Sequence, residues 1–231
     1  MFVEPNPDVI AANPGGANDP LGESVLDPAN PWLRVFSPAD IRVVIGRHQD
    51  PAREVHLAHA RTDRIPVHRR ASGGGAVVLA PGMVVIAVRL RPGPVPGRPD
   101  PAPSSAISGG WPGLVNHAIA AAIHDVTGIA PTVRGLGDLA INDGGAERKI
   151  LGSSLRQTAR LVAYLGVLLV DDATALMDRL LASPSREPDY RGGRDHGRFC
   201  THLSRLGATV PLVVGALEQP LARDLDPWAA R

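Results

Sequence analysis

The chain has 231 residues, of which 44% are hydrophobic and 20% charged, and this composition is typical of a soluble protein with one substantial core. A net charge of +1 argues against a function that depends on attraction to nucleic acid or to an acidic membrane. With 25 Gly and 23 Pro residues, the chain holds too many helix breakers for a helical bundle.

The cysteine content and the apolar runs bear on location. The sole cysteine, Cys200, cannot form an internal disulfide, which favours a reducing compartment, and we expect a cytoplasmic protein. The N-terminal segment lacks the basic and apolar regions of a signal peptide, and the longest apolar run, residues 162–170, is too short to span a bilayer.

The local patterns predict a mixed α+β fold, with a largely antiparallel sheet and flanking helices. Residues 1–30 lack periodicity and predict a poorly ordered arm, whereas residues 31–231 form a single domain. Strands are expected at 33–36 and 41–45, as neighbours, and at 65–69, 76–80, 83–90 and 159–170. Helices are expected at 50–61, 112–128, 171–181 and 210–225, and the Pro-rich residues 91–113 predict a loop.

A glycine triplet marks the first candidate site. In the segment Arg69 to Val77, three consecutive glycines follow Arg70 and Ser72. Glycines let backbone N–H groups approach a ligand closely, and a guanidinium offers a planar fork to a carboxylate or phosphate. The segment therefore predicts an anion cradle, with a flexible turn between strands as the alternative. It is not a Walker A loop, because no Gly-Lys-Ser/Thr follows.

The second candidate site contains the only lysine of the chain, Lys149. A chain that otherwise uses Arg for positive charge has kept Lys here, which favours a role for a compact ammonium over a chance surface residue. The turn sequence 142–145 predicts a hairpin that brings Asp138 and Lys149 together on paired strands. Such an ammonium could neutralise charge on an acyl or phosphoryl oxygen. For Asp138 alone, a turn carboxylate is the alternative.

These motifs together resemble a known family. Arg-Arg-x-Ser-Gly-Gly-Gly-Ala-Val, followed by Asp-Leu and then Arg-Lys-Ile-x-Gly-Ser-Ser, is similar to the lipoate–protein ligase and octanoyltransferase family, which shares its catalytic fold with biotin–protein ligases. The similarity runs from about Leu33 to Leu206, with weaker flanking matches at residues 45–47 and 189–191.

The resemblance implies an activity and a set of site residues. ATP with Mg²⁺ would activate lipoate or octanoate as an acyl-adenylate, and a lysine of a carrier domain would then take the acyl group. The expected carriers are lipoyl domains of 2-oxoacid dehydrogenases or the H protein of glycine cleavage. Lys149 is the implied catalytic residue, as an electrostatic stabiliser. The implied substrate-binding residues are Arg70, Ser72, Gly73, Gly74, Gly75, Ala76, Asp138, Gly152 and Ser153.

The chain also departs from the family pattern. Gly137 stands where Asn is usual, Tyr164-Leu165-Gly166 where a His-Gly pair is common, and Met83 where Asn is expected. No accessory domain follows Leu225, so a separate accessory chain is one expected partner.

The sequence also allows several alternatives. A transferase that forms a covalent acyl-enzyme would use Cys200, but this residue lies far downstream of Lys149. A non-enzymatic homologue that binds acyl-adenylate is another alternative. The histidines His48, His56 and His59 lack partners at ligand spacing, and we predict no metal site. A basic cluster, Arg186, Arg191, Arg194 and Arg198, indicates either a solvated loop or a docking surface for an acidic carrier.

Overall fold

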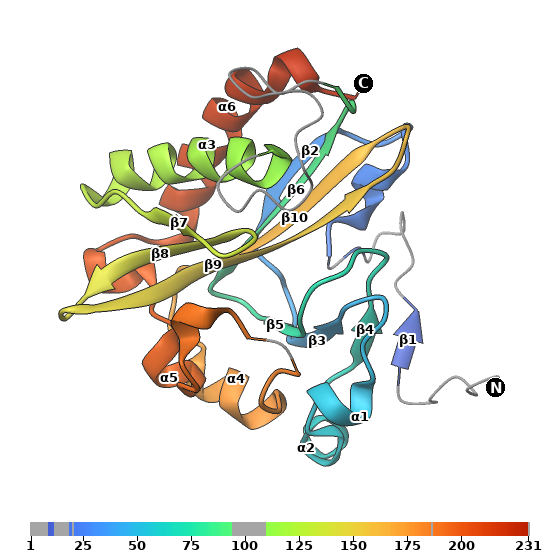
Figure 1. The fold of residues 1–231 in the computed structure, drawn as a ribbon, viewed down its shortest axis with the longest axis vertical. Helices are drawn as coiled ribbons and strands as arrows, with labels where there is room; N and C mark the ends of the chain where they lie inside the picture. The colour runs from blue at the N-terminus through green and yellow to red at the C-terminus, as the bar shows by residue number, and fades with distance from the viewer. Residues whose placement is uncertain (1–8, 12–18, 20, 94–109, 186, 231) are drawn as a thin grey trace.

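A computed structural model describes residues 9–11, 19, 21–93, 110–185 and 187–230 (Figure 1). The larger of two sheets has six strands, in the order β2 (Leu33–Phe36), β6 (Met83–Leu90), β10 (Val162–Leu169), β9 (Ala146–Gln157), β8 (Asp138–Asp143) and β7 (Thr132–Arg134), and all neighbours are antiparallel. The smaller sheet has the order β1 (Val9–Ala11), β4 (Val67–Arg69), β3 (Arg42–Ile45) and β5 (Val77–Leu79), with a parallel arrangement except for the last pair. The expected α+β fold is confirmed.

Helices cover both sides of the large sheet. The α-helices are α1 (Pro51–Glu54), α2 (Leu57–Thr62), α3 (Gly110–Thr127), α4 (Thr174–Leu180), α5 (His196–Phe199) and α6 (Val210–Leu225). Short 3-10 helices are η1 (Glu23–Leu26), η2 (Asp189–Arg191), η3 (Leu203–Leu206) and η4 (Asp226–Trp228). Helices α3 and α6 lie together on one side of the large sheet, whereas the small sheet and α1, α2, α4 and α5 lie on the other (Figure 1). Among the described residues, no helix is both long enough and apolar enough to cross a membrane.

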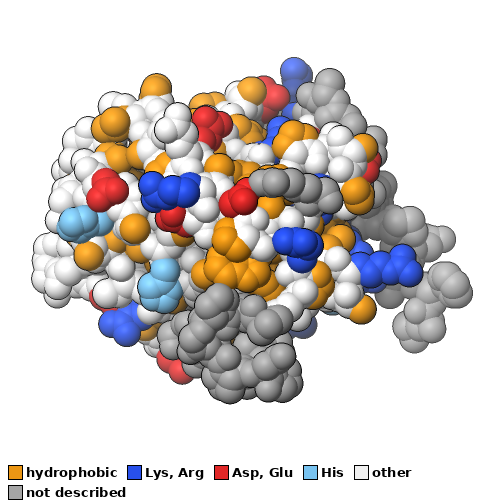
Figure 2. Space-filling view, turned by 90° about the horizontal axis from the view of Figure 1, so that it is seen from above, with side chains coloured by type: hydrophobic (Ala, Val, Ile, Leu, Met, Phe, Trp, Pro, Cys, Tyr) orange, Lys and Arg blue, Asp and Glu red, His pale blue; other side chains and the backbone are white. Residues whose placement is uncertain are grey.

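The main core lies between the large sheet and the pair α3 and α6. Alternate residues of β6, such as Ile86, point into it and are fully buried. Ile119 of α3 and Leu217 of α6 meet them from the helical side. The outer surface of this helical side carries scattered charges rather than one charged patch (Figure 2). A second apolar cluster fills the space between the small sheet and α4.

One pair of predicted strands is correct as strands but wrong as neighbours. Residues 33–36 and 42–45 fall in different sheets, because β2 pairs with β6 and β3 pairs with β4 and β5. Strands β5 and β6 are likewise separated by a bend at Gly82, whose φ of +89° favours glycine. The backbone N–H of Asp171 donates to the Gly82 carbonyl at 2.8 Å and holds this bend. Turn residues thus mark a change of sheet here rather than a hairpin.

The remaining predicted elements show smaller differences. The hairpin at 142–145 is confirmed, with Gly144 and Gly145 at positive φ. The helix expected at 50–61 is two helices, because Val55 is extended and forms a bridge with Leu181. Within the expected arm, residues 21–30 belong to the fold, and η1 is buried on the large sheet. Residues 9–11 of the arm form β1, which pairs with β4, so the expectation of a poorly ordered arm is wrong for these segments. Residues 1–8, 12–18 and 20 and most of the Pro-rich loop lie outside the described residues.

Candidate active site

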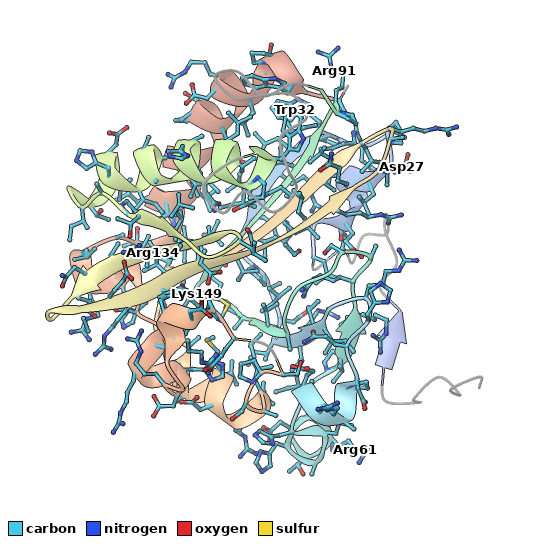
Figure 3. The ribbon with its side chains drawn as sticks, in the orientation of Figure 1. Asp27, Trp32, Arg61, Arg91, Arg134 and Lys149 are labelled. Carbon is cyan, nitrogen blue, oxygen red and sulfur yellow. The ribbon has the colours of Figure 1, made fainter. Side chains whose placement is uncertain are left out.

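The centre of the candidate site is an ion pair on the β8–β9 hairpin, near the label of Lys149 in Figure 3. The Lys149 Nζ lies 2.8 Å from Asp138 Oδ1. A register shift between Leu139 and Ala140 places Lys149 opposite Ala140, on the same face of the sheet as Asp138. The predicted pairing of the two strands is therefore confirmed, and the contact is direct.

Tyr190 completes this pair. Its hydroxyl donates to Asp138 Oδ2 at 2.9 Å, so both carboxylate oxygens have partners. Burial, followed by the Asp138 charge, raises the pKa of Tyr190, and the phenol therefore stays a neutral donor. In the sequence, Tyr190 stands only inside the weak flanking match at residues 189–191. The fold brings it to Asp138 from 52 residues downstream.

The lysine ammonium lies against bare backbone at Gly152. A Cβ added to Gly152 would stand 2.8 Å from Lys149 Nζ and 2.9 Å from its Cε. Any larger residue at this position would therefore displace the end of the lysine side chain. The same lack of space argues against a guanidinium in place of the ammonium.

The glycine-rich loop, residues 72–76, is held by Arg70. The buried guanidinium donates from Nη2 to the carbonyls of Gly73, at 2.7 Å, and Gly75, at 2.8 Å. Burial lowers the pKa of Arg70 to about 10, so the group remains cationic at neutral pH. The Arg70 N–H groups, which were expected to bind an anion, thus donate to carbonyls of the loop. Arg70 therefore holds the loop conformation. Ala76 packs on the apolar cluster of the small sheet.

The loop and the lysine strand meet at β9. Ser72 Oγ and Ser154 Oγ are 2.9 Å apart, and a Cβ on Gly74 would lie 3.4 Å from the Ser154 Cβ. On the other side, Gly46 passes so close that an added Cβ would stand 2.2 Å from the Gly74 carbonyl oxygen. The two predicted motifs therefore converge on residues 152–154 of one strand.

Ser153 bonds to the turn before Asp138, whereas Ser154 bonds to the glycine-rich loop. The Ser153 Oγ donates to the Gly137 carbonyl at 2.7 Å. A Cβ added to Gly137 would lie only 2.3 Å from this Ser153 Oγ. Ser153 therefore fixes the turn before Asp138. In the family pattern this turn residue is Asn, and here the space beside the backbone is filled by Ser153.

Glu23 is a site neighbour that sequence reasoning missed. It is buried at the start of η1, and its Oε1 accepts from the backbone N–H of Ala71 at 2.6 Å. Burial raises the pKa of Glu23, while the Arg70 charge acts in the opposite direction. No pattern in the N-terminal segment pointed to this contact, because only the fold brings residue 23 beneath the glycine-rich loop.

Cys200 lies next to Lys149 in space. The two residues form a parallel β-bridge, and the backbone N–H of Thr201 donates to the Lys149 carbonyl at 2.9 Å. Cys200 as a whole residue is 3% exposed. Burial raises the pKa of Cys200 to about 11, although the charges of Lys149 and Arg191 oppose this shift. Cys200 is far from Lys149 in the sequence, which argued against a Cys–Lys pair, but the two residues are adjacent in the structure.

Other positions that the family pattern would make polar are apolar here. Leu165 packs with Val25 and Ala87, and Met83 is buried beneath the small sheet. Tyr164 is turned toward α3, where its hydroxyl donates to Asn116 Oδ1 at 2.6 Å. Leu165 and Met83 therefore offer no polar side-chain group to the site, and the Tyr164 hydroxyl bonds to α3.

The described residues do not fit a Mg²⁺ site built from side chains. Among them, no group of three or more His, Cys, Asp or Glu side chains could hold a metal ion. Asp138 already has partners on both oxygens. His56 and His59 are near each other, with ring centroids 5.6 Å apart, and no third ligand of the described chain joins them.

Two arginines of the basic cluster in the last loop make internal contacts. The guanidinium groups of Arg191 and Arg194 lie 5.1 and 5.3 Å from the centre of the Phe199 ring. Arg194 also donates to the carbonyls of Glu147 and Tyr190. Arg198 is exposed, and Arg186 lies outside the described residues. Two of the four residues of the predicted cluster therefore contact the segment that carries Tyr190.

Comparison with known proteins gives a consistent result. The family described as the lipoyl protein ligase A/B catalytic domain matches residues 23–222. The fold is similar to that of a bipartite lipoate protein ligase from the lipoylation system of Thermoplasma acidophilum, which also includes an E2 lipoyl domain (19% identity, TM-score 0.70, 94% of this chain and 82% of that one). It is also similar to lipoate-protein ligase A bound with ATP (18% identity, TM-score 0.69, 94% and 83%).

A further similar structure is LipL1 of P. falciparum in complex with lipoate, with 18% identity and a TM-score of 0.64. That match covers 84% of this chain but 50% of the P. falciparum chain. At these identities the likeness establishes the fold.

Proposed function

The chain belongs to the lipoyl protein ligase A/B catalytic-domain family, and from this membership we propose that it attaches a lipoyl or octanoyl group to a lysine of a carrier domain. A carboxylate oxygen of the acid attacks the α-phosphorus of ATP, and pyrophosphate leaves. The carrier lysine amine then attacks the acyl carbon, loses a proton, and AMP leaves.

One observation carries the proposal: the ammonium of Lys149 is held by Asp138 over the bare backbone of Gly152. In both steps negative charge builds up on oxygens of the acyl or phosphoryl group. A fixed ammonium stabilises that charge more in the transition state than in the ground state, which is what accelerates a reaction. Asp138 and Tyr190 act as positioning residues for this ammonium.

The glycine-rich loop is the proposed cover of the acyl-adenylate. Gly73, Gly74 and Gly75 are exposed, and added Cβ atoms at Gly73 and Gly75 would meet nothing within 4 Å. Their backbone can therefore approach a ligand closely. The relatives solved with ATP and with lipoate support these substrates. Mg²⁺, where ATP brings it, belongs with the phosphate oxygens rather than with a cage of described side chains.

The partners follow from the reaction. We propose lipoyl domains of 2-oxoacid dehydrogenases or the glycine cleavage H protein as acceptors, supported by the E2 lipoyl domain of the T. acidophilum system. Because that ligase is bipartite, a separate accessory chain is a proposed partner here too. Assays with and without such a chain test this point.

The test of the main proposal uses purified protein with ATP, octanoate or lipoate, and a lipoyl domain, read by intact mass. We expect an acylated acceptor only when ATP is present. Lys149→Arg keeps the charge but does not fit over Gly152, so transfer should fall on the order of 100-fold or more. Unchanged transfer by a folded Lys149→Arg protein would show that the electrostatic role is wrong.

A second candidate function rests on the position of Cys200 beside Lys149. In this route the Cys200 thiolate attacks the acyl carbon of a thioester donor, and the donor thiol leaves with a proton. The carrier lysine then attacks the acyl-enzyme thioester and regenerates the thiol. The raised pKa of Cys200, about 11, keeps the thiol protonated near neutral pH, so we rank this route second.

The two routes separate in one experiment. Product from an acyl-carrier thioester without ATP, abolished by Cys200→Ser, supports the transferase. Product that requires ATP and survives Cys200→Ser supports the ligase. Binding of acyl-adenylate without product from either donor would indicate a homologue that binds but does not transfer.

A further inference from the structure

Leu136 is the most exposed large hydrophobic residue in the described part of the chain. Its exposed fraction is 71%, against 50% for Leu212 and 37% for Ile41. It lies between β7 and β8, two residues before Asp138. Single exposed apolar residues are common, so exposure alone does not indicate a binding role. A role for Leu136 therefore depends on where this residue lies.

The turn that carries Leu136 is tightly held. Arg134 and Asp138 pair across it, and Figure 3 shows Arg134 just above the hairpin that holds Lys149. Gly137 is buried and its carbonyl accepts from Ser153 Oγ at 2.7 Å. Gly135 has a φ of +52° and packs toward Pro188, in the segment that leads to Tyr190. Leu136 is therefore presented from a fixed backbone.

This position is the rim of the proposed reaction site. Asp138, which holds Lys149 and Tyr190, follows Leu136 by two residues. A protein that offers a lysine to the acyl carbon must bring its own surface against this rim. An apolar side chain on a fixed backbone at this rim can pack against such a surface, and the contact then buries it away from water.

We propose that Leu136 is an apolar contact for the acceptor carrier domain, seated on the carrier surface beside its acceptor lysine. The inference rests on the proposed function and adds a specific contact residue to it. The acyl group and the nucleotide do not need this contact, because Leu136 stands outside the Lys149–Asp138 pair.

The test compares a carrier domain with hydroxylamine as acyl acceptor, under whichever donor the wild-type protein uses. Leu136→Asp should raise the KM for the carrier at least about tenfold, because it sets a charge against an apolar contact. The rate of hydroxamate formation should not change. Leu212→Asp, on α6, is the matched control at another exposed leucine and should change neither rate. Leu136→Met should restore carrier acylation.

Three results would overturn the inference or separate it from the proposed function. An unchanged carrier KM in Leu136→Asp refutes the contact. A loss of hydroxamate formation as well assigns Leu136 to acyl or nucleotide binding and also refutes it. If the wild-type protein transfers no acyl group, the proposed function fails. Titration of an isotope-labelled carrier domain with wild-type and Leu136→Asp protein then decides the contact by equal or weakened binding.

Discussion

The two faces of the six-stranded sheet pack against different partners, and β6 shows this within eight residues. On one face Val84, Ile86 and Val88 are fully buried against α3 and α6. On the other, Ala87 packs with η1, and Arg89 donates to the carbonyls of Val25 and Asp27.

The same contrast extends to the site. Arg70, Glu23 and His196 are buried charged or titratable groups near the face that holds Lys149, and each has a hydrogen-bond partner. Burial of such groups is costly unless they are paired, whereas apolar packing stabilises without that cost. One face therefore packs on the main apolar core, whereas the other combines smaller apolar clusters with buried polar groups that are held by partners.

The largest expected effect is a loss of stability from a substitution on the face that packs against α3 and α6. Ile86→Ala removes a fully buried side chain from between the sheet and the helices, and should lower the free energy of unfolding by about 2–5 kcal/mol. Urea unfolding followed by circular dichroism measures it. At temperatures where the variant is folded, acyl transfer should match the wild type. A loss below about 1 kcal/mol would contradict the assignment of this face as the main core.

The next effect concerns the site face and should leave stability nearly unchanged. Gly152→Ala places a Cβ 2.8 Å from Lys149 Nζ, and the flexible end of the lysine must move aside. Displacement of a stabilising group by about 1 Å can cost on the order of 100-fold in rate. We expect that loss in the acyl transfer assay with little change in unfolding. Full activity would show that the ammonium need not lie over Gly152.

A third effect appears only as a dependence on pH. Burial lowers the pKa of His196 below 6.5, against the opposing hydrogen bond to Asp178. The unfolded chain thus binds this proton more readily, so the contribution of His196 is complete above about pH 6.5 and is lost as the pH falls through the folded pKa. Unfolding near pH 8 and near pH 5 should show a smaller loss for His196→Asn than for the wild type. Equal losses would contradict this.

The smallest effect is a gain on the helical side. Gly215 lies inside α6, and an added Cβ would meet nothing within 4 Å. Gly215→Ala should therefore raise the free energy of unfolding by about 0.5–1 kcal/mol, because alanine favours a helix. Thermal unfolding measures the gain. Acyl transfer should be unchanged, which makes this variant the control for Gly152→Ala, and reduced transfer would contradict the separation of the two faces.

Local signals in the sequence predicted several contacts of the candidate site. The glycine triplet, the solitary lysine and the turn at 142–145 are short-range features, and the Asp138–Lys149 contact follows from a hairpin that such a turn specifies. Tyr190 and Glu23 could not be found this way. Each reaches the site through a long chain excursion, and neither carries a local pattern of its own.

By itself, the sequence determined the element types, the α+β class and the two motifs, because periodicity, turn residues and a single retained lysine act over a few neighbouring positions. The tertiary structure decided which strands share a sheet, as with residues 33–36 and 42–45. It also decided that Cys200 and Lys149, 51 positions apart, are bridge partners. Such pairings depend on how whole layers pack, and no local propensity encodes them.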